Sequence, residues 1–143
     1  MARGNVQIEG FERGSNILLK LSRPQKKILR RQVGRALRPV AKRAKQLAPQ
    51  PGYPGDKPGL TPLRRTIKVS TRTTKTGVTG KVSAKAPHAH LVEFSHRHFA
   101  HGEPTGVLTE AQPFMGPAIQ DTRQAQDRAV REGILEIIAE ARK

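Results

Sequence analysis

Apolar residues between positions 22 and 48 recur at steps of three and four, which is the spacing of one face of an α-helix. Ser22 and Gln25 have the spacing of a capping box, and Pro24 falls in the first turn, where a missing N–H costs nothing. Pro49 disfavours helical geometry in the residue before it. We therefore predict one long helix over residues 22–48.

The side of this helix opposite its apolar face carries a nearly continuous line of cations. From residue 20 to residue 45 the chain has eleven basic residues and no acidic one. Like charges at this density repel one another unless an anion lies nearby. We expect this face to meet DNA or an acidic partner through Lys27, Arg31, Arg35, Arg38, Lys42 and Lys45.

The same asymmetry runs through the whole chain. Residues 1–92 hold 21 of the 27 Lys and Arg residues and three of the 11 acidic ones, whereas residues 93–143 hold six basic and eight acidic residues. Phosphate contacts by Lys and Arg do not depend on base sequence, and no helix-turn-helix, zinc-finger or RNA-binding motif indicates base reading. The charge pattern alone therefore also fits a non-specific nucleic-acid-binding protein of ribosomal or nucleoid type.

The remainder of the chain predicts a mixed fold. Residues 49–62 hold five prolines and three glycines and form a loop; residues 64–95 contain three strand candidates, Arg64–Thr71, Thr76–Lys85 and His88–Ser95, in an antiparallel arrangement. Residues 96–112 form a second, His-rich loop. Residues 113–142 form a helix with an apolar stripe that includes Val130, Ile134 and Ile138. We expect a single α+β domain over residues 1–143, with a small antiparallel sheet packed by the two long helices.

The sequence gives little support for an enzyme. The chain has no cysteine, which excludes disulfides and thiolate metal sites. All five histidines lie between His88 and His101, which raises the hypothesis of a metal-dependent enzyme, but their spacing matches no known ligand motif. Glu93 beside them is one carboxylate without a partner. We predict no catalytic residue, metal or cofactor, and no apolar run approaches the ~20 residues of a membrane span.

Three matches carry a resemblance, and the third has two parts. RALRPVAKRAKQLAP (residues 35–49) is similar to a basic helix that closes on Ala-Pro, and GLTPLRRTIKV (59–69) to a Gly-x-Leu-Arg-x-Ser-Ile segment before a strand. APHAHLVEFS (86–95) and AQPFMGPAI (111–119) are similar to a Tyr-Ala-x-x-Val-Glu-Phe-Gly strand and a Gln-Pro-Phe-x-x-Pro-Ala helix start. In this order they resemble the small tail-component, neck or tail-completion proteins of long-tailed double-stranded DNA phages. The chain departs at residues 56–59, where the family has Asp-Thr-Gly, and at Ser95-His96, where it has Gly-Thr.

The resemblance implies a structural virion protein made in the host cytoplasm and located at the head–tail junction. It implies a ring around the DNA channel, with the same chain, head-connector proteins, tail proteins and sequence-independent double-stranded DNA as partners. We expect the two loops, residues 49–62 and 96–112, to reach adjacent rings. The residues expected to do so are Tyr53, Asp56, Lys57, His96 and His98.

Overall fold

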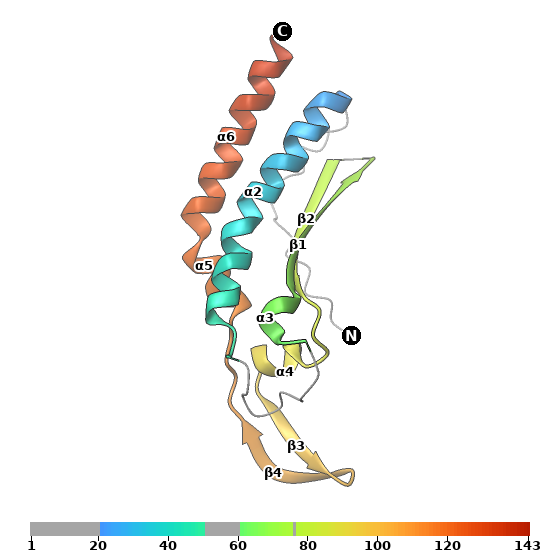
Figure 1. Cartoon of the computed structure of the whole chain (residues 1–143), viewed down its shortest axis with the longest axis vertical. Coiled ribbons are helices and arrows are strands. Elements are labelled where there is room, and N and C mark those ends of the chain that lie inside the picture. Colours follow the sequence, from blue (N-terminus) through green and yellow to red (C-terminus); the bar gives the residue numbers. More distant parts are fainter. Residues whose placement is uncertain (1–20, 51–60, 76) are drawn as a thin grey trace.

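The computed structural model describes residues 21–50, 61–75 and 77–143. Figure 1 shows an elongated molecule in which one long helix lies between a second long helix and a β-hairpin. The described elements include two antiparallel two-stranded sheets, so the predicted α+β class is confirmed. The elements run in the order α2 (Arg23–Leu47), α3 (Leu63–Thr66), β1 (Ile67–Thr74), β2 (Gly77–Ala84), α4 (Ala89–Glu93), β3 (His96–Ala100), β4 (Glu103–Thr109), α5 (Met115–Asp121) and α6 (Arg123–Ala141).

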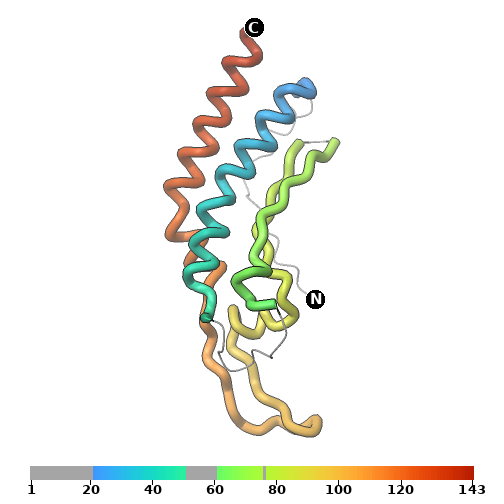
Figure 2. Tube along the Cα trace, viewed as in Figure 1, coloured from blue at the N-terminus to red at the C-terminus, as the bar shows by residue number. Residues whose placement is uncertain are grey.

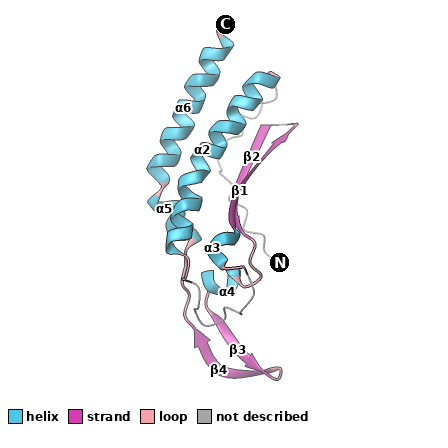
Figure 3. Ribbon diagram, viewed as in Figure 1, coloured by secondary structure: helices cyan, strands magenta, loops and turns pink. Residues whose placement is uncertain are grey.

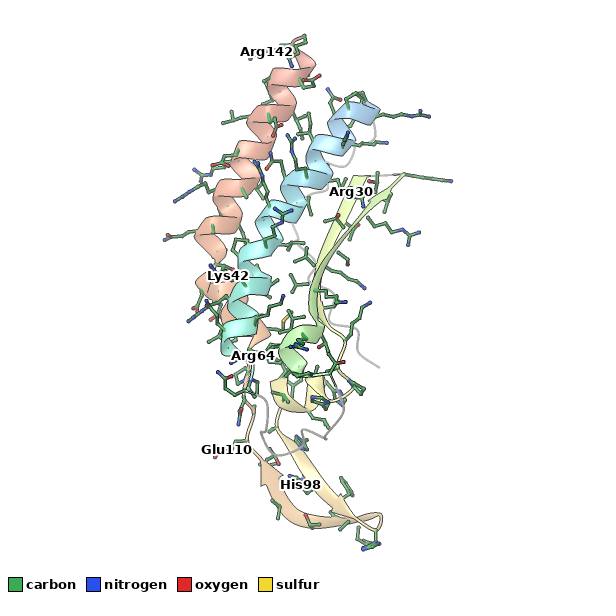
Figure 4. All side chains as sticks on the ribbon, in the orientation of Figure 1. Arg30, Lys42, Arg64, His98, Glu110 and Arg142 are labelled. Carbon is green, nitrogen blue, oxygen red and sulfur yellow. The ribbon has the colours of Figure 1, made fainter. Side chains whose placement is uncertain are left out.

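Helix α2 begins and ends as its sequence predicts. The Gln25 N–H donates to Ser22 Oγ (3.5 Å), and the Ser22 N–H donates to Gln25 Oε1 (2.9 Å), which completes the capping box. At the other end, Ala48 turns extended with ψ 142°. The Arg64 guanidinium donates to the Ala48 carbonyl from Nε (2.9 Å) and Nη2 (2.7 Å), so one side chain satisfies a carbonyl at the helix end. Figure 4 shows Arg64 at this end of α2.

The first two predicted strands correspond to the β1–β2 hairpin, which packs on α2. The predicted start at Arg64 is wrong, because residues 64–66 belong to the short helix α3. The register of the hairpin pairs Ile67 with Ala84 and Thr74 with Gly77. Gly80 brings the hairpin close to the helix, because a Cβ there would overlap the side chains of Val33 and Leu37. The apolar face of α2 therefore covers one side of this small sheet.

The third predicted strand, His88–Ser95, is wrong. After Ala86 and Pro87 the chain turns into the short helix α4, which places Val92 in the core at 8 % exposure. A short apolar run has too few residues for its periodicity to separate strand from helix, and here burial of Val92 decides the conformation. The expected antiparallel arrangement of three strands is therefore replaced by two separate hairpins.

The prediction that residues 96–112 form a loop is also wrong, because these residues contain the β3–β4 hairpin. The turn residues His101 and Gly102 have φ of 54° and 87°, the positive values that two-residue hairpin turns require. We call residues 94–110 the arm. Figure 3 shows its two strands projecting from one end of the molecule.

The predicted helix 113–142 is two helices, α5 and α6, which meet at Thr122. Thr122 leaves helical geometry (φ −105°, ψ 7°), and its hydroxyl donates to the Ala118 carbonyl (2.7 Å). The colours of Figure 2 show that α6 runs antiparallel to α2. The buried core gathers near the C-terminal end of α2. Its members are Val40, Ala41, Ala44, Ala48, Leu63, Ile67, Ala86, Val92, Phe114 and Ala118.

Candidate functional site

The six cations predicted to face a polyanion share one exposed side of α2. The side chains that α2 buries are all uncharged. They are Gln32, Ala36, Val40, Ala41 and Ala44. We call the exposed cations the basic ridge. They are Lys27, Arg31, Arg35, Arg38, Lys42 and Lys45, and each is exposed.

The ridge belongs to a larger surface without negative charge. Residues 21–50, 61–75 and 77–92, which include α2, α3, β1 and β2, contain 17 basic residues and no acidic one. Lys68, Arg72 and Lys81 on the β1–β2 hairpin are exposed and extend the positive charge beyond the helix. Sequence reasoning missed these three as site residues, although the same absence of acids marks them. We call these elements together the basic layer.

A shallow groove of about 470 Å³ lies between α2 and β1 within the basic layer. Its floor is apolar and is made by Ala41, Ile67 and Val69, of which Ile67 is fully buried. Its rim carries four cations, Arg38, Lys42, Lys45 and Lys68. The groove therefore combines positive charge with an apolar floor, a combination suited to an anionic group attached to an apolar one. Figure 4 shows Lys42 on α2.

Acidic side chains meet α2 along α5 and α6. Glu136 accepts hydrogen bonds from Arg31 and Gln32, and Asp121 accepts from Arg43 Nε at 2.7 Å. The Gln32 amide and then the Arg31 guanidinium lower the pKa of the Glu136 carboxyl from its ordinary 4.5. Arg31 is thus partly neutralised within the chain, whereas no acidic side chain of the described residues forms an ion pair with the other five ridge cations.

The arm carries two of the predicted assembly residues, His96 and His98. The two imidazole centroids lie 5.3 Å apart, His96 Nδ1 lies 3.1 Å from the Leu91 carbonyl, and His98 Nε2 contacts the Thr109 hydroxyl. Figure 4 shows His98 in the arm. Within the described ranges no three His, Asp or Glu side chains gather in a way that could hold a metal ion.

The other predicted assembly residues, Tyr53, Asp56 and Lys57, lie outside the described residues. The structure instead shows exposed apolar side chains along the arm that sequence reasoning did not single out. They are Phe94 (68 % exposed), Phe99 (65 %), Val107 (56 %) and Leu108 (60 %). Their signal in the sequence is weak, because an apolar residue in a supposed loop carries no periodicity.

Comparison with known proteins decides the family. Residues 16–94, just over half of the chain, match the model of a family described as bacteriophage HK97-gp10 tail-component proteins. The chain belongs to this family. It is a structural component of a phage tail rather than an enzyme, and such a component contacts other virion proteins. No curated protein and no solved structure matches the chain, and no described helix is long and apolar enough to cross a membrane.

The motifs that resemble the HK97-gp10-like family have structural roles here. In the Leu-Arg-x-Ser-Ile segment, Leu63 and Ile67 are core residues and Arg64 caps α2. The Thr66 hydroxyl donates to the Leu63 carbonyl (2.7 Å) and accepts from the Ala86 N–H (3.2 Å). Glu93 of the Val-Glu-Phe segment accepts from backbone N–H groups that begin α5. The matched residues 16–94 thus hold the framework, while β3, β4, α5 and α6 lie beyond them.

Proposed function

We propose that the protein assembles as a ring around the DNA channel at the head–tail junction and joins the head connector to the tail. Each protomer is a single domain over residues 1–143. The observation that carries this proposal is the basic layer, with 17 basic residues and no acidic residue in the described part of residues 21–92. A structural protein of a DNA-containing particle needs such a surface where it meets packaged DNA.

The basic ridge faces the DNA. Helix α2 has 25 residues and is about 37 Å long, so its exposed side can lie along roughly one turn of duplex DNA. The ridge offers Lys and Arg side chains without a base-reading motif, so its contacts are with phosphates and are independent of sequence. A channel through which any part of a genome passes requires this property.

A second partner class is favoured at the lower end of the ridge. The apolar floor of Ala41, Ile67 and Val69 adds nothing to binding a phosphate backbone, but it suits an acidic segment of a neighbouring virion protein. In this alternative, Arg38, Lys42, Lys45 and Lys68 meet carboxylates of the head connector or the tail. The upper ridge, with Lys27 and Arg35, then remains the DNA contact.

The ring is tested on nuclease-treated protein by light scattering at moderate and high salt, with negative-stain images of the same fractions. Closed rings that persist at high salt support the proposal, because binding to residual DNA would be lost there. A monomer that holds DNA only at low salt would instead support a free, non-specific nucleic-acid-binding protein. A labelled copy incorporated into virions should be seen at the head–tail junction.

A further inference from the structure

Two apolar surfaces of this chain have no partner within its described part. One is the arm, with the exposed residues Phe94, Phe99, Val107 and Leu108. The other lies on α6, where Val130, Ile134 and Ile138 are 47 %, 51 % and 43 % exposed. These three residues are four apart and share one face of the helix. We call them the α6 stripe.

The α6 stripe is not the face that packs on α2. That contact is made at Gly133, where a Cβ would lie 2.8 Å from Gln32 Cβ, and at Glu136, which accepts from Arg31 and Gln32. Helix α6 therefore has two sides with different roles. One is covered by its own chain, and the other presents branched aliphatic side chains to solvent.

The arm also has apolar side chains that its own chain does not cover. A single two-stranded hairpin is marginally stable in water unless a hydrophobic face is covered. Phe99, Val107 and Leu108 each keep more than half of their surface exposed, so neither face of the arm is covered by a packed core. Exposed apolar patches of this kind mark protein–protein contacts.

We propose that the arm of one protomer packs on the α6 stripe of the next copy of the chain. This inference rests on the proposed ring and names the contact that builds it. It also concerns residues outside the family match, which ends at residue 94. All of α6 and all of the arm except Phe94 lie beyond that residue.

Charge favours a second copy as the occupant of both surfaces. The arm carries Arg97 against Glu103 and Glu110, and α6 over residues 123–141 carries three arginines against four acidic residues. Both surfaces are within about one charge of neutral, whereas the basic layer holds 17 cations and no acidic residue of its own. Two copies of a chain with net charge +16 repel each other least through their neutral surfaces, which keeps the basic layers apart. A nucleic acid has no attraction to either neutral surface.

The arrangement of the two surfaces favours a ring. The arm projects from one end of the elongated protomer, and α6 runs toward the other end, so the arm lies far from the stripe of its own chain (Figures 1 and 3). A contact between two different patches is heterologous and head-to-tail, and such contacts generate closed rings when the rotation closes.

Paired variants test the contact. The arm variant is Phe99→Ser with Leu108→Ser, and the stripe variant is Ile134→Gln with Ile138→Gln; all four positions are exposed, so folding is expected to persist. Glu132→Gln, at an exposed site on the side of α6 opposite the stripe, is the control. In 0.5 M NaCl, light scattering should show oligomers for the wild type and the control. Each double variant should fall to the 15.8 kDa monomer.

Mixing the two variants gives the decisive result. Each mixed pair retains one intact arm and one intact stripe, so an equimolar mixture should form heterodimers and nothing larger. A mixture that stays monomeric would overturn the proposal. A single variant that stays oligomeric alone would overturn it too, because it would indicate an arm–arm or a stripe–stripe contact. Variants that still form full rings would overturn this contact while leaving the ring in place. A monomeric wild type would overturn both.

A disulfide cross-link tests the same contact without the polar substitutions in the arm and the stripe. The chain has no cysteine, so Phe99→Cys and Ile134→Cys in separate chains place one thiol on each surface. Mild oxidation of the mixture should give a disulfide-linked dimer at a rate at least tenfold above that of Phe99→Cys mixed with Glu132→Cys, whose thiol lies on the opposite side of α6. Equal rates in the two mixtures would reject the contact.

Discussion

The carboxylate of Glu93 accepts a hydrogen bond from the backbone N–H of Phe114 at 2.9 Å, which ties together the two ends of the arm. The same side chain accepts from the N–H groups of Met115 (3.0 Å) and Gly116 (3.1 Å). Three donors at the start of α5 would otherwise lack partners. Because Phe114 is 1 % exposed, this hydrogen bond joins the residues that flank the arm to the buried core.

Glu93→Ala should lower the free energy of unfolding by about 2–3 kcal/mol, because it leaves charge-assisted hydrogen bonds unmade at a partly buried helix start. Glu93→Gln should cost less, since its amide oxygen still accepts from one or two N–H groups. Urea unfolding measures both. A loss from Glu93→Ala below 0.5 kcal/mol would show that water replaces the carboxylate, and amide hydrogen exchange at Phe114 and Met115 would then be unchanged.

The close approach of α6 to α2 at Gly133 gives a second prediction. Gly133→Ala places a Cβ 2.8 Å from Gln32 Cβ, so the helices must separate. We expect a net loss of about 1–2 kcal/mol, because overpacking outweighs the gain in helix propensity of about 1 kcal/mol. The matched control is Gly116→Ala in α5, where the new Cβ would meet only Glu93 Oε1 at 3.7 Å. Thermal melting should show the control at least as stable as the wild type.

Glu136 links stability to pH. Its pKa is lowered by the Gln32 amide and then by Arg31, so the folded chain binds a proton at Glu136 less readily than the unfolded chain does. The stabilisation is complete above the ordinary pKa of 4.5 and is lost as pH falls through the lowered folded-state value. Urea midpoints should therefore drop between pH 7 and pH 3 by more in the wild type than in Glu136→Gln. Equal drops would mean that the contact does not distinguish the two protonation states.

Local signals made α2 and the β1–β2 hairpin predictable. The capping box of Ser22 and Gln25 lies within four residues, and an amphipathic helix of 25 residues repeats its pattern many times. The exposure of the basic ridge follows from the same periodicity. The prediction of α4 as a strand failed because five residues repeat no pattern, and the core position of Val92 and the bonds of Glu93 decide its conformation.

Distant partners were beyond sequence reasoning. Arg31 and Glu136 are 105 positions apart, and nothing local indicates that one ridge cation is partly neutralised. The β3–β4 hairpin was missed because its turn is His101-Gly102 rather than the usual Asn-Gly or Asp-Gly. An apolar stripe at helical spacing does not tell which of its residues a neighbour covers, and on α6 the side that holds Val130, Ile134 and Ile138 stays exposed while α2 covers another side.

The ridge makes a prediction that separates DNA contact from general basicity. If Lys42 and Lys45 contact phosphates, replacing either with Gln should flatten the dependence of log K on log salt by about 0.9 for random-sequence duplex DNA. Both side chains are exposed, so melting temperature should change little. Lys143→Gln is the control, because it removes the same single positive charge away from the ridge. Lys143 lies beyond the C-terminal end of α6, where its Nζ is 2.9 Å from Glu140. Fluorescence anisotropy between 50 and 300 mM NaCl, a range chosen for its strong counterion effect, measures the slopes. If all three variants flatten the slope equally, net charge rather than the ridge governs binding; if only the ridge variants do, α2 is the surface that meets DNA.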